Sequence, residues 1–344
     1  MKKIIASVLA VLILFTACGK ETVGTDYDFS SVIDETVRQV VNAAPSPMHD
    51  SIYGEWSVIN AAICNADVPQ SWFDAYYENL CAVLMDSDGV LSATKNTEYS
   101  RTIIALSAIG KNPANTAGYD LFAHYMTIDE ISKQGISGVI FALIALDCKD
   151  YPLPKDSDVT REDLIDYILE KEYDGGGWAI IGDTADVDIT AQVLQALAPH
   201  TDDEKVAAAV ERAIALLSAR QNDDGGFYAW KGINSQTTAQ VIIALTSLGI
   251  NPRTDERFIK SDGWTGSFIM KYYLNDGSFC HTIGNGSDPM ATDQCLQALI
   301  SIKMLDNGQG SFYDFTYRKK GAQLPFCCTA YFLLGFLGRF LRTV

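Results

Sequence analysis

Apolar segments recur along the chain, and the clearest of them share a polar first turn, an early Thr or Tyr and an Ala-Leu finish. They carry almost no charge after the first turn. Helices that are apolar on most faces are buried between neighbouring elements, so we expect these segments to form an inner layer. The clearest copies are TEYSRTIIAL (97–106), DITAQVLQAL (188–197), QTTAQVIIAL (236–245) and MATDQCLQAL (290–299), and the weaker copies are WSVINAAI (56–63), GVIFALIAL (138–146) and TAYFLLGF (329–336).

A second set of segments alternates with the first along the chain. These segments mix charged residues with apolar residues at three- and four-residue spacing, which is typical of half-exposed helices. We expect them to form an outer layer that packs its apolar stripe against the inner one. They cover residues 31–44, 70–85, 119–131, 160–172, 203–221 and 255–274.

Glycine-containing turns lead from the outer segments to the inner ones, at SDGVL (87–91), YDGGGW (173–178), NDDGGF (222–227) and NDGSF (275–279). Glycine adopts backbone angles that residues with a Cβ avoid, so the chain can reverse sharply at these points. The repeat length is about fifty residues, and period-two strand patterns are nearly absent. The sequence therefore predicts an all-α fold over residues 30–344, in which six or seven inner helices stand within a ring of outer helices: an α/α toroid.

One stretch resembles a known repeat. RAIALLSARQNDDGGF (212–227) is similar to the QW repeat of squalene-hopene and oxidosqualene cyclases, although Leu216 and Phe227 replace its more usual aromatic residue and Trp. Residues 50–337 resemble the prenyltransferase and squalene oxidase repeat superfamily, which includes terpenoid cyclases, protein prenyltransferase β subunits and the transcobalamin α domain, and within it the prenyltransferase-repeat lipoproteins of bacterial surfaces. The resemblance implies the α/α toroid and says less about function. The residues at the motif's positions are Arg212, Leu216, Gln221, Gly225 and Phe227.

The first residues predict export. A basic start is followed by an apolar run too short to span a bilayer, and FTAC (15–18) resembles the lipobox of bacterial lipoproteins, with Phe15 in place of the usual Leu. We expect a signal peptide over residues 1–17, cleavage before Cys18 and lipidation of that cysteine. Residues 18–29 would then form a tether to a bacterial cell surface or periplasmic membrane. A plain secretory signal is the alternative.

Charge and cysteine content narrow the possible partners. A net charge of −17 repels phosphate backbones and anionic headgroups, so we expect no nucleic-acid binding, and membrane contact through the lipid alone. No CxxC pair occurs, and no cofactor is predicted. Cys64, Cys148 and Cys295 fall at apolar-periodic positions, where thiols behave as small buried hydrophobes.

The segment DVDIT (186–190) resembles the acid motif of the triterpene cyclases. Asp186 and Asp188 match its first and third positions, while Ile189 replaces the final acidic residue of the hopene-cyclase form. The resemblance implies that Asp188 is a general acid, a role that needs an apolar, aromatic-lined cavity. The alternative is that Asp186 or Asp188 caps the following helix, since Asp is a favoured N-cap residue.

Two further kinds of site can be considered. Asp293 and Cys295 have the Asp-x-Cys spacing of the protein prenyltransferase zinc site, but no histidine follows His281, so we predict no metal and a buried thiol. A carbohydrate-active toroid would need a carboxylate pair among Asp186, Asp188 and Asp288.

Polar residues gather where the inner helices begin, which should be one end of the ring. The leading hypothesis is a lipid-anchored protein that binds a small molecule or a surface protein there without catalysis. A terpenoid cyclase-like enzyme that uses Asp188 and a carbohydrate-active toroid are the alternatives, and simple helix caps in contact with water would also explain several of these residues. The predicted ligand-binding residues are Trp56, Asn96, Glu98, Trp178, Asp186, Asp188, Asn234, Gln236, Asp288 and Asp293.

Overall fold

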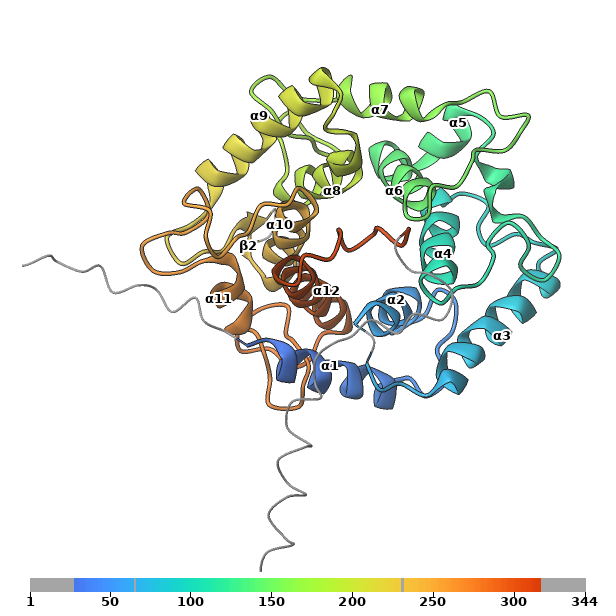
Figure 1. Cartoon of the computed structure of the whole chain (residues 1–344), viewed down its shortest axis with the longest axis horizontal. Coiled ribbons are helices and arrows are strands. Elements are labelled where there is room, and N and C mark those ends of the chain that lie inside the picture. Colours follow the sequence, from blue (N-terminus) through green and yellow to red (C-terminus); the bar gives the residue numbers. More distant parts are fainter. Residues whose placement is uncertain (1–27, 65, 230–231, 317–344) are drawn as a thin grey trace, which may run out of the picture.

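The computed structural model describes residues 28–64, 66–229 and 232–316 of the chain. Its helices lie in two concentric layers, as Figure 1 shows. Among the described residues, six helices form the inner layer, and each coincides with one of the predicted apolar segments. They are α2 (Glu55–Ile63), α4 (Asn96–Ala108), α6 (Ile136–Asp147), α8 (Val187–Leu197), α10 (Ser235–Ser247) and α12 (Pro289–Asp306).

The inner helices form a closed ring. Each contacts the next in chain order, and α12 contacts α2, so the last described inner helix meets the first. The predicted α/α toroid is therefore confirmed, with six inner helices in the described chain. The weaker copy at 329–336 lies outside the described residues, as do the signal peptide, Cys18 and most of the tether.

The outer layer agrees with the prediction except in two segments. The helices are α1 (Ser30–Ala43), α3 (Gln70–Asp86), α5 (Ile128–Ile131), α7 (Arg161–Leu169), α9 (Glu204–Arg220) and α11 (Thr265–Met270), with 3-10 turns η1 (Leu121–His124), η2 (Ser132–Gln134) and η3 (Ala198–His200). The predicted helix over 119–131 is broken, because Asp120 caps η1 and Thr127 caps α5. The predicted helix over 255–274 shrinks to α11, since Gly263 packs so closely that a Cβ there would lie 2.6 Å from the Asp224 carbonyl oxygen.

One small strand pair was not predicted. β1 (Tyr228–Ala229) pairs in antiparallel register with β2 (Gly232–Ile233), just before α10. Two residues per strand are too few to show a period-two pattern in the sequence.

A shared hydrogen bond explains why Thr recurs early in three inner helices. After each glycine turn, a fully buried aromatic residue donates its backbone N–H to the Thr hydroxyl of the helix that follows. The turn is thereby fixed to the inner layer, and the aromatic ring fills the space between the layers. The three bonds are Trp178 N to Thr190 Oγ1 (3.0 Å), Phe227 N to Thr238 Oγ1 (3.3 Å) and Phe279 N to Thr292 Oγ1 (3.0 Å).

The inner helices are parallel, so the ring has two different ends. We call the end at which they begin the mouth and the opposite end the far end. Lys303, near the end of α12, donates from Nζ to Ser30 Oγ at 2.7 Å, so α1 starts at the far end. Residues 307–316 also lie there, where Phe315 N donates to the Cys148 carbonyl oxygen at 2.7 Å. Among the described helices, none has the length and apolar character of a membrane span.

Candidate functional site at the mouth of the ring

The first aspartate of DVDIT is a helix cap. Asp186 precedes α8, and its side chain accepts a hydrogen bond from Ile189 N at 3.0 Å. Asn234 and Asp288 occupy the same position before α10 and α12, where they accept from Thr237 N at 2.9 Å and from Ala291 N at 2.8 Å. These three residues satisfy backbone N–H groups that a helix start leaves without partners. Their recurrence therefore belongs to the scaffold.

The second aspartate has a different environment. Asp188 lies inside α8, and its Oδ2 is 3.2 Å from the hydroxyl of Thr237 on α10. Burial, reinforced by the charge of Asp186, raises the pKa of Asp188 to about 6. No cation of the described chain lies within ion-pairing distance of it. Thr237 Oγ1 also lies 3.1 Å from Asn234 Oδ1, so its single hydrogen can serve only one of the two acceptors at a time.

Gln236 and His281 bring the loop before α12 to the start of α10. His281 Nδ1 contacts Gln236 Oε1, and because an amide oxygen only accepts, the ring nitrogen is the donor. Ser235 Oγ donates to the Cys280 carbonyl oxygen at 2.8 Å and fixes the same loop. Neither His281 nor Thr237 was among the predicted site residues, because nothing in a single sequence shows which loop residue meets which helix.

Glu98 belongs to a charge network between α2 and α4. Both Glu98 and the buried Glu55 pair with Arg101, whose Nε lies 3.1 Å from Glu55 Oε2, and His49 Nδ1 lies 2.7 Å from Glu55 Oε1. Burial would raise the pKa of Glu55, but the hydrogen bond from His49 and the charge of Arg101 outweigh it and hold the pKa below its usual value. Both carboxylates thus already share Arg101 as a partner within the protein. The neighbouring Asn96 is buried, and its amide nitrogen makes no hydrogen bond within the described residues.

Asp293 lies where α12 contacts α2 and closes the ring, a contact that we call the seam. Ser57 Oγ of α2 donates to its carboxylate at 2.7 Å, and Asn60 Nδ2 donates to its backbone oxygen at 3.0 Å. Burial raises the pKa of Asp293 to about 7. The nearby Cys295 is fully buried, and burial raises the pKa of its thiol, which disfavours the thiolate that a metal would need. Asp293 therefore joins α12 to α2, and the buried, protonated thiol of Cys295 does not favour a zinc site.

The two predicted tryptophans lie in different places. Trp56 of α2 is partly exposed, and its ring centroid lies 5.9 Å from that of Phe141 on α6, a helix that is not its neighbour in the ring. This pair therefore reaches into the interior of the ring. Trp178 is fully buried, and its indole N–H donates to the Ile168 carbonyl oxygen at 2.7 Å. Trp178 lies in the connection from α7 to α8 at the mouth end, but its ring is buried in the core and is not available to a ligand.

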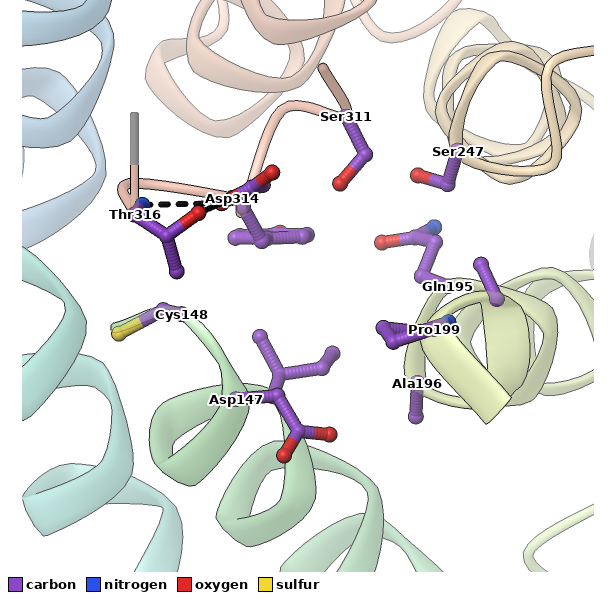
Figure 2. Close-up of a pocket in the computed structure, with 12 residues that line it drawn as sticks. Asp147, Cys148, Gln195, Ala196, Pro199, Ser247, Ser311, Asp314 and Thr316 are labelled. Atoms are coloured by element: carbon purple, nitrogen blue, oxygen red, sulfur yellow. Dashed lines mark hydrogen bonds between the residues drawn. The ribbon is translucent and has the colours of Figure 1, made fainter. Parts of the chain in front are cut away.

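A half-open pocket lies at the far end of the ring. It has a volume of about 360 Å³, and Figure 2 shows the ends of α6, α8 and α10 and residues 311–316 around it. Its groups are mostly paired within the protein: Asp147 contacts Arg161 and His200, each at 2.7 Å. Tyr313 is the one aromatic residue among those lining it. The lining residues are Ile144, Asp147, Cys148, Gln195, Ala196, Ala198, Pro199, Ser247, Ser311, Tyr313, Asp314 and Thr316.

Two buried pairs of polar side chains lie among the inner helices. Gln195 on α8 donates from Nε2 to Gln240 Oε1 on α10 at 3.0 Å, and Gln297 on α12 donates to the Tyr313 hydroxyl at 2.8 Å. Amide side chains thus face inward along the inner helices. A cavity that stabilises carbocations would present aromatic faces there.

Comparisons with known proteins agree with this architecture. The family model of the squalene-hopene cyclase C-terminal domain matches residues 176–298, which include α8 to α11 and the start of α12. No curated protein matches the chain. A variant of the type II terpene cyclase MstE from Scytonema, in complex with merosterolic acid A, shares the fold at a TM-score of 0.53 and 13% identity, over 80% of this chain and 97% of the cyclase chain.

Two other solved structures share the fold to a similar degree. A polysaccharide lyase gives a TM-score of 0.55 at 12% identity, over 81% of this chain and 99% of the lyase chain. A protein from Actinoplanes gives a TM-score of 0.51 at 14% identity, over 80% of this chain and 100% of the Actinoplanes chain. Cyclases and a lyase thus share one scaffold, so the fold does not select a reaction. Residues 176–298 thus resemble the squalene-hopene cyclase C-terminal domain, and the closed double ring is an α/α toroid of the kind found in a type II terpene cyclase.

Proposed function

We propose that this toroid binds a small polar ligand at its mouth, without catalysis, and that the ligand presents a cationic or hydrogen-bond-donating group to Asp188. One observation carries the proposal: Asp188 is a partly buried carboxyl group that caps no helix and pairs with no cation of the described chain. A buried charge without a partner is costly, and a ligand cation would remove that cost.

The surroundings of Asp188 support a polar ligand over a hydrocarbon. Gln236, His281 and Asp186 lie on the same side of the mouth and can form further hydrogen bonds to a bound molecule. Within the described residues, Trp56 and Phe141 form the one aromatic pair that spans the interior of the ring, and a polyprene would need a more continuous aromatic lining. We also propose that the protein is exported and lipidated at Cys18. Metabolic labelling with palmitate would test this, since the label should be lost in the Cys18→Ser variant.

The ligand proposal can be tested with simple cations. Because a cation favours the ionised carboxylate, the affinity for spermidine or choline should rise as pH increases through about 6. We expect calorimetry to show binding at pH 8 that weakens at pH 5. Asp188→Asn should abolish this pH dependence, whereas Asp183→Asn, which removes an exposed carboxylate from the same loop region, should keep it. Equal binding by wild type and Asp188→Asn would refute the proposal.

A second candidate is acid catalysis on an isoprenoid. The observation in its favour is that Asp188 occupies the acid position of DVDIT within the family match and, with its pKa raised to about 6, keeps its proton to a higher pH than an ordinary aspartic acid. This candidate requires cyclised product from squalene or a shorter polyprene, lost in Asp188→Asn. Product formation by the wild type would displace the non-catalytic proposal. A carbohydrate-active toroid has less support, since Asp186 and Asp288 are engaged as helix caps.

A further inference from the structure

Exposed apolar side chains are confined to one end of the molecule. The most exposed large hydrophobic side chains are Ile52 at 70%, Ile181 at 66%, Met290 at 62% and Tyr228 at 61%. Every large hydrophobic residue that is exposed in the described chain lies in a connection from an outer helix to an inner helix, or in the helical turn beside it. All of these connections are at the mouth. We call this set of side chains the apolar rim.

The apolar rim extends around most of the ring. Met48 and Ile52 precede α2, and Met85 and Val90 flank the connection to α4. Further around the ring, Ile180 and Ile181 precede α8, Tyr228 precedes α10, and Ile283 precedes α12, the helix that closes the ring against α2. A small molecule beside Asp188 cannot reach five separate connections. A macromolecular surface can.

The charges around the apolar rim limit what could cover it. In the connections that carry it, carboxylates outnumber basic side chains, as around Ile180 and Ile181, where Glu170, Asp174 and Asp183 oppose Lys171, and Glu172 pairs with Arg212 of α9. Such a surface repels nucleic acid and anionic lipid headgroups. It also repels a second copy of itself placed mouth to mouth. The complementary surface is one that combines apolar and basic side chains.

A bilayer that holds the chain by its amino-terminal segment does not fit the apolar rim either. The described chain enters at the far end, where Asp28 and Ser30 lie beside Lys303 of α12. An α12 of 18 residues is about 27 Å long. A protein held from its amino-terminal side at the far end therefore presents its mouth away from the anchor.

We propose that the apolar rim is the docking surface for a polypeptide partner whose contact region combines apolar and basic residues. Exposed apolar side chains grouped at one site commonly mark protein interfaces. The partner covers the mouth and, with it, the region around Asp188. The docking surface uses different side chains from the ligand site and does not depend on it.

Two synthetic peptides can test the docking surface on the purified full chain: a 15-residue peptide that alternates Leu with Lys, and a peptide of equal length and charge that alternates Ser with Lys. We expect the Leu peptide to bind about tenfold more tightly. The combined variant Ile180→Ser, Ile181→Ser and Ile283→Ser should lose that advantage. The same three positions changed to Val form the matched control and should keep it, since all three sites are exposed and tolerate substitution.

Three results would overturn the docking proposal. They are equal affinity for the two peptides, an undiminished advantage of the Leu peptide in the Ser variant, and sedimentation of the wild type with phosphatidylcholine vesicles that is lost in the Ser variant, which would make the partner a membrane. The Asp188→Asn variant should keep the Leu peptide's advantage. Failure of the ligand proposal and failure of the docking proposal therefore give different results.

Discussion

Two aspartates separated by one residue have different roles in this protein. Asp186 accepts a hydrogen bond from the backbone of its own helix, while Asp188 faces α10 and meets a side-chain hydroxyl there. The difference follows from helix geometry, because a cap precedes the first helical turn and a residue two positions later already lies on its surface. The acidic motif therefore contains one structural residue and one residue available for function.

This division predicts opposite outcomes for two substitutions. Asp186→Ala should destabilise the fold by about 1 kcal/mol, since it removes an N-cap. Asp188→Asn should instead stabilise the fold at pH 7.5, by on the order of 1 to 3 kcal/mol, because it removes a buried charge whose pKa is raised to about 6 while its amide oxygen can still accept from Thr237. Urea unfolding at pH 7.5 measures both. A larger loss in Asp188→Asn than in Asp186→Ala would show that Asp188 is the structural residue.

At the scale of elements, the repeat depends on the glycine turn before each inner helix. Gly225 has a φ of +90°, and a Cβ there would lie 2.5 Å from the backbone of Trp264, on the connection to α11. Gly118 has the same φ, but a Cβ there would meet nothing within 4 Å. Comparing Gly225 with Gly118 separates the free-energy cost of the backbone angle from the cost of the close contact.

Substituting each of these glycines by Ala tests that separation. Gly118→Ala should cost about 1 kcal/mol, for the left-handed angle alone. Gly225→Ala should cost about 1 to 3 kcal/mol more, because backbone must move to admit the methyl group. Thermal or urea unfolding of both variants measures the difference. Equal losses of stability in the two variants would mean that the turn can move away from the connection to α11 without a cost in free energy.

The inner helices could be predicted from sequence because burial on all sides leaves a strong apolar signal. The outer helices were less predictable. Between 119 and 131, apolar spacing continues through a segment that Asp120 and Thr127 divide, since side-chain caps can start new helices wherever tertiary packing favours them. At the mouth, Glu98 was predicted to bind a ligand, but it pairs with Arg101 one turn along the same helix. That i,i+3 spacing is visible in the sequence, whereas the pairing of Arg101 with Glu55 of α2 is not.

At the scale of the whole molecule, ring closure depends on a single seam. Asp293 of α12 meets Ser57 and Asn60 of α2, helices more than 200 residues apart in the chain. Its pKa is raised from 3.8 to about 7, so the folded protein binds this proton more tightly than the unfolded chain does. The stabilising effect is complete below about pH 4 and is lost as pH rises through 7.

The seam therefore makes stability depend on pH in a way that one variant should remove. Asp293→Asn keeps hydrogen-bonding capacity without a charge, so it should be more stable than the wild type at pH 8.5, by on the order of 1 to 4 kcal/mol, and similar at pH 5. Urea unfolding of both proteins at the two pH values gives the difference, and other titrating groups cancel in the comparison. A constant difference between pH 5 and 8.5 would contradict a buried, proton-binding seam.

Both boundaries of the described toroid are found on the side away from Asp188: α1 begins beside Lys303, and Phe315 is bonded to the end of α6. A fluorophore, an affinity handle or a solid support attached beyond either boundary would leave the opposite face open to solution. The same geometry favours circular permutation, with residues 28 and 316 bridged by a flexible linker and new ends cut into one of the connections at the mouth. The protein can thus be attached in a fixed orientation, or given new chain ends, without changing the inner helices that bear Asp188 and Asp293.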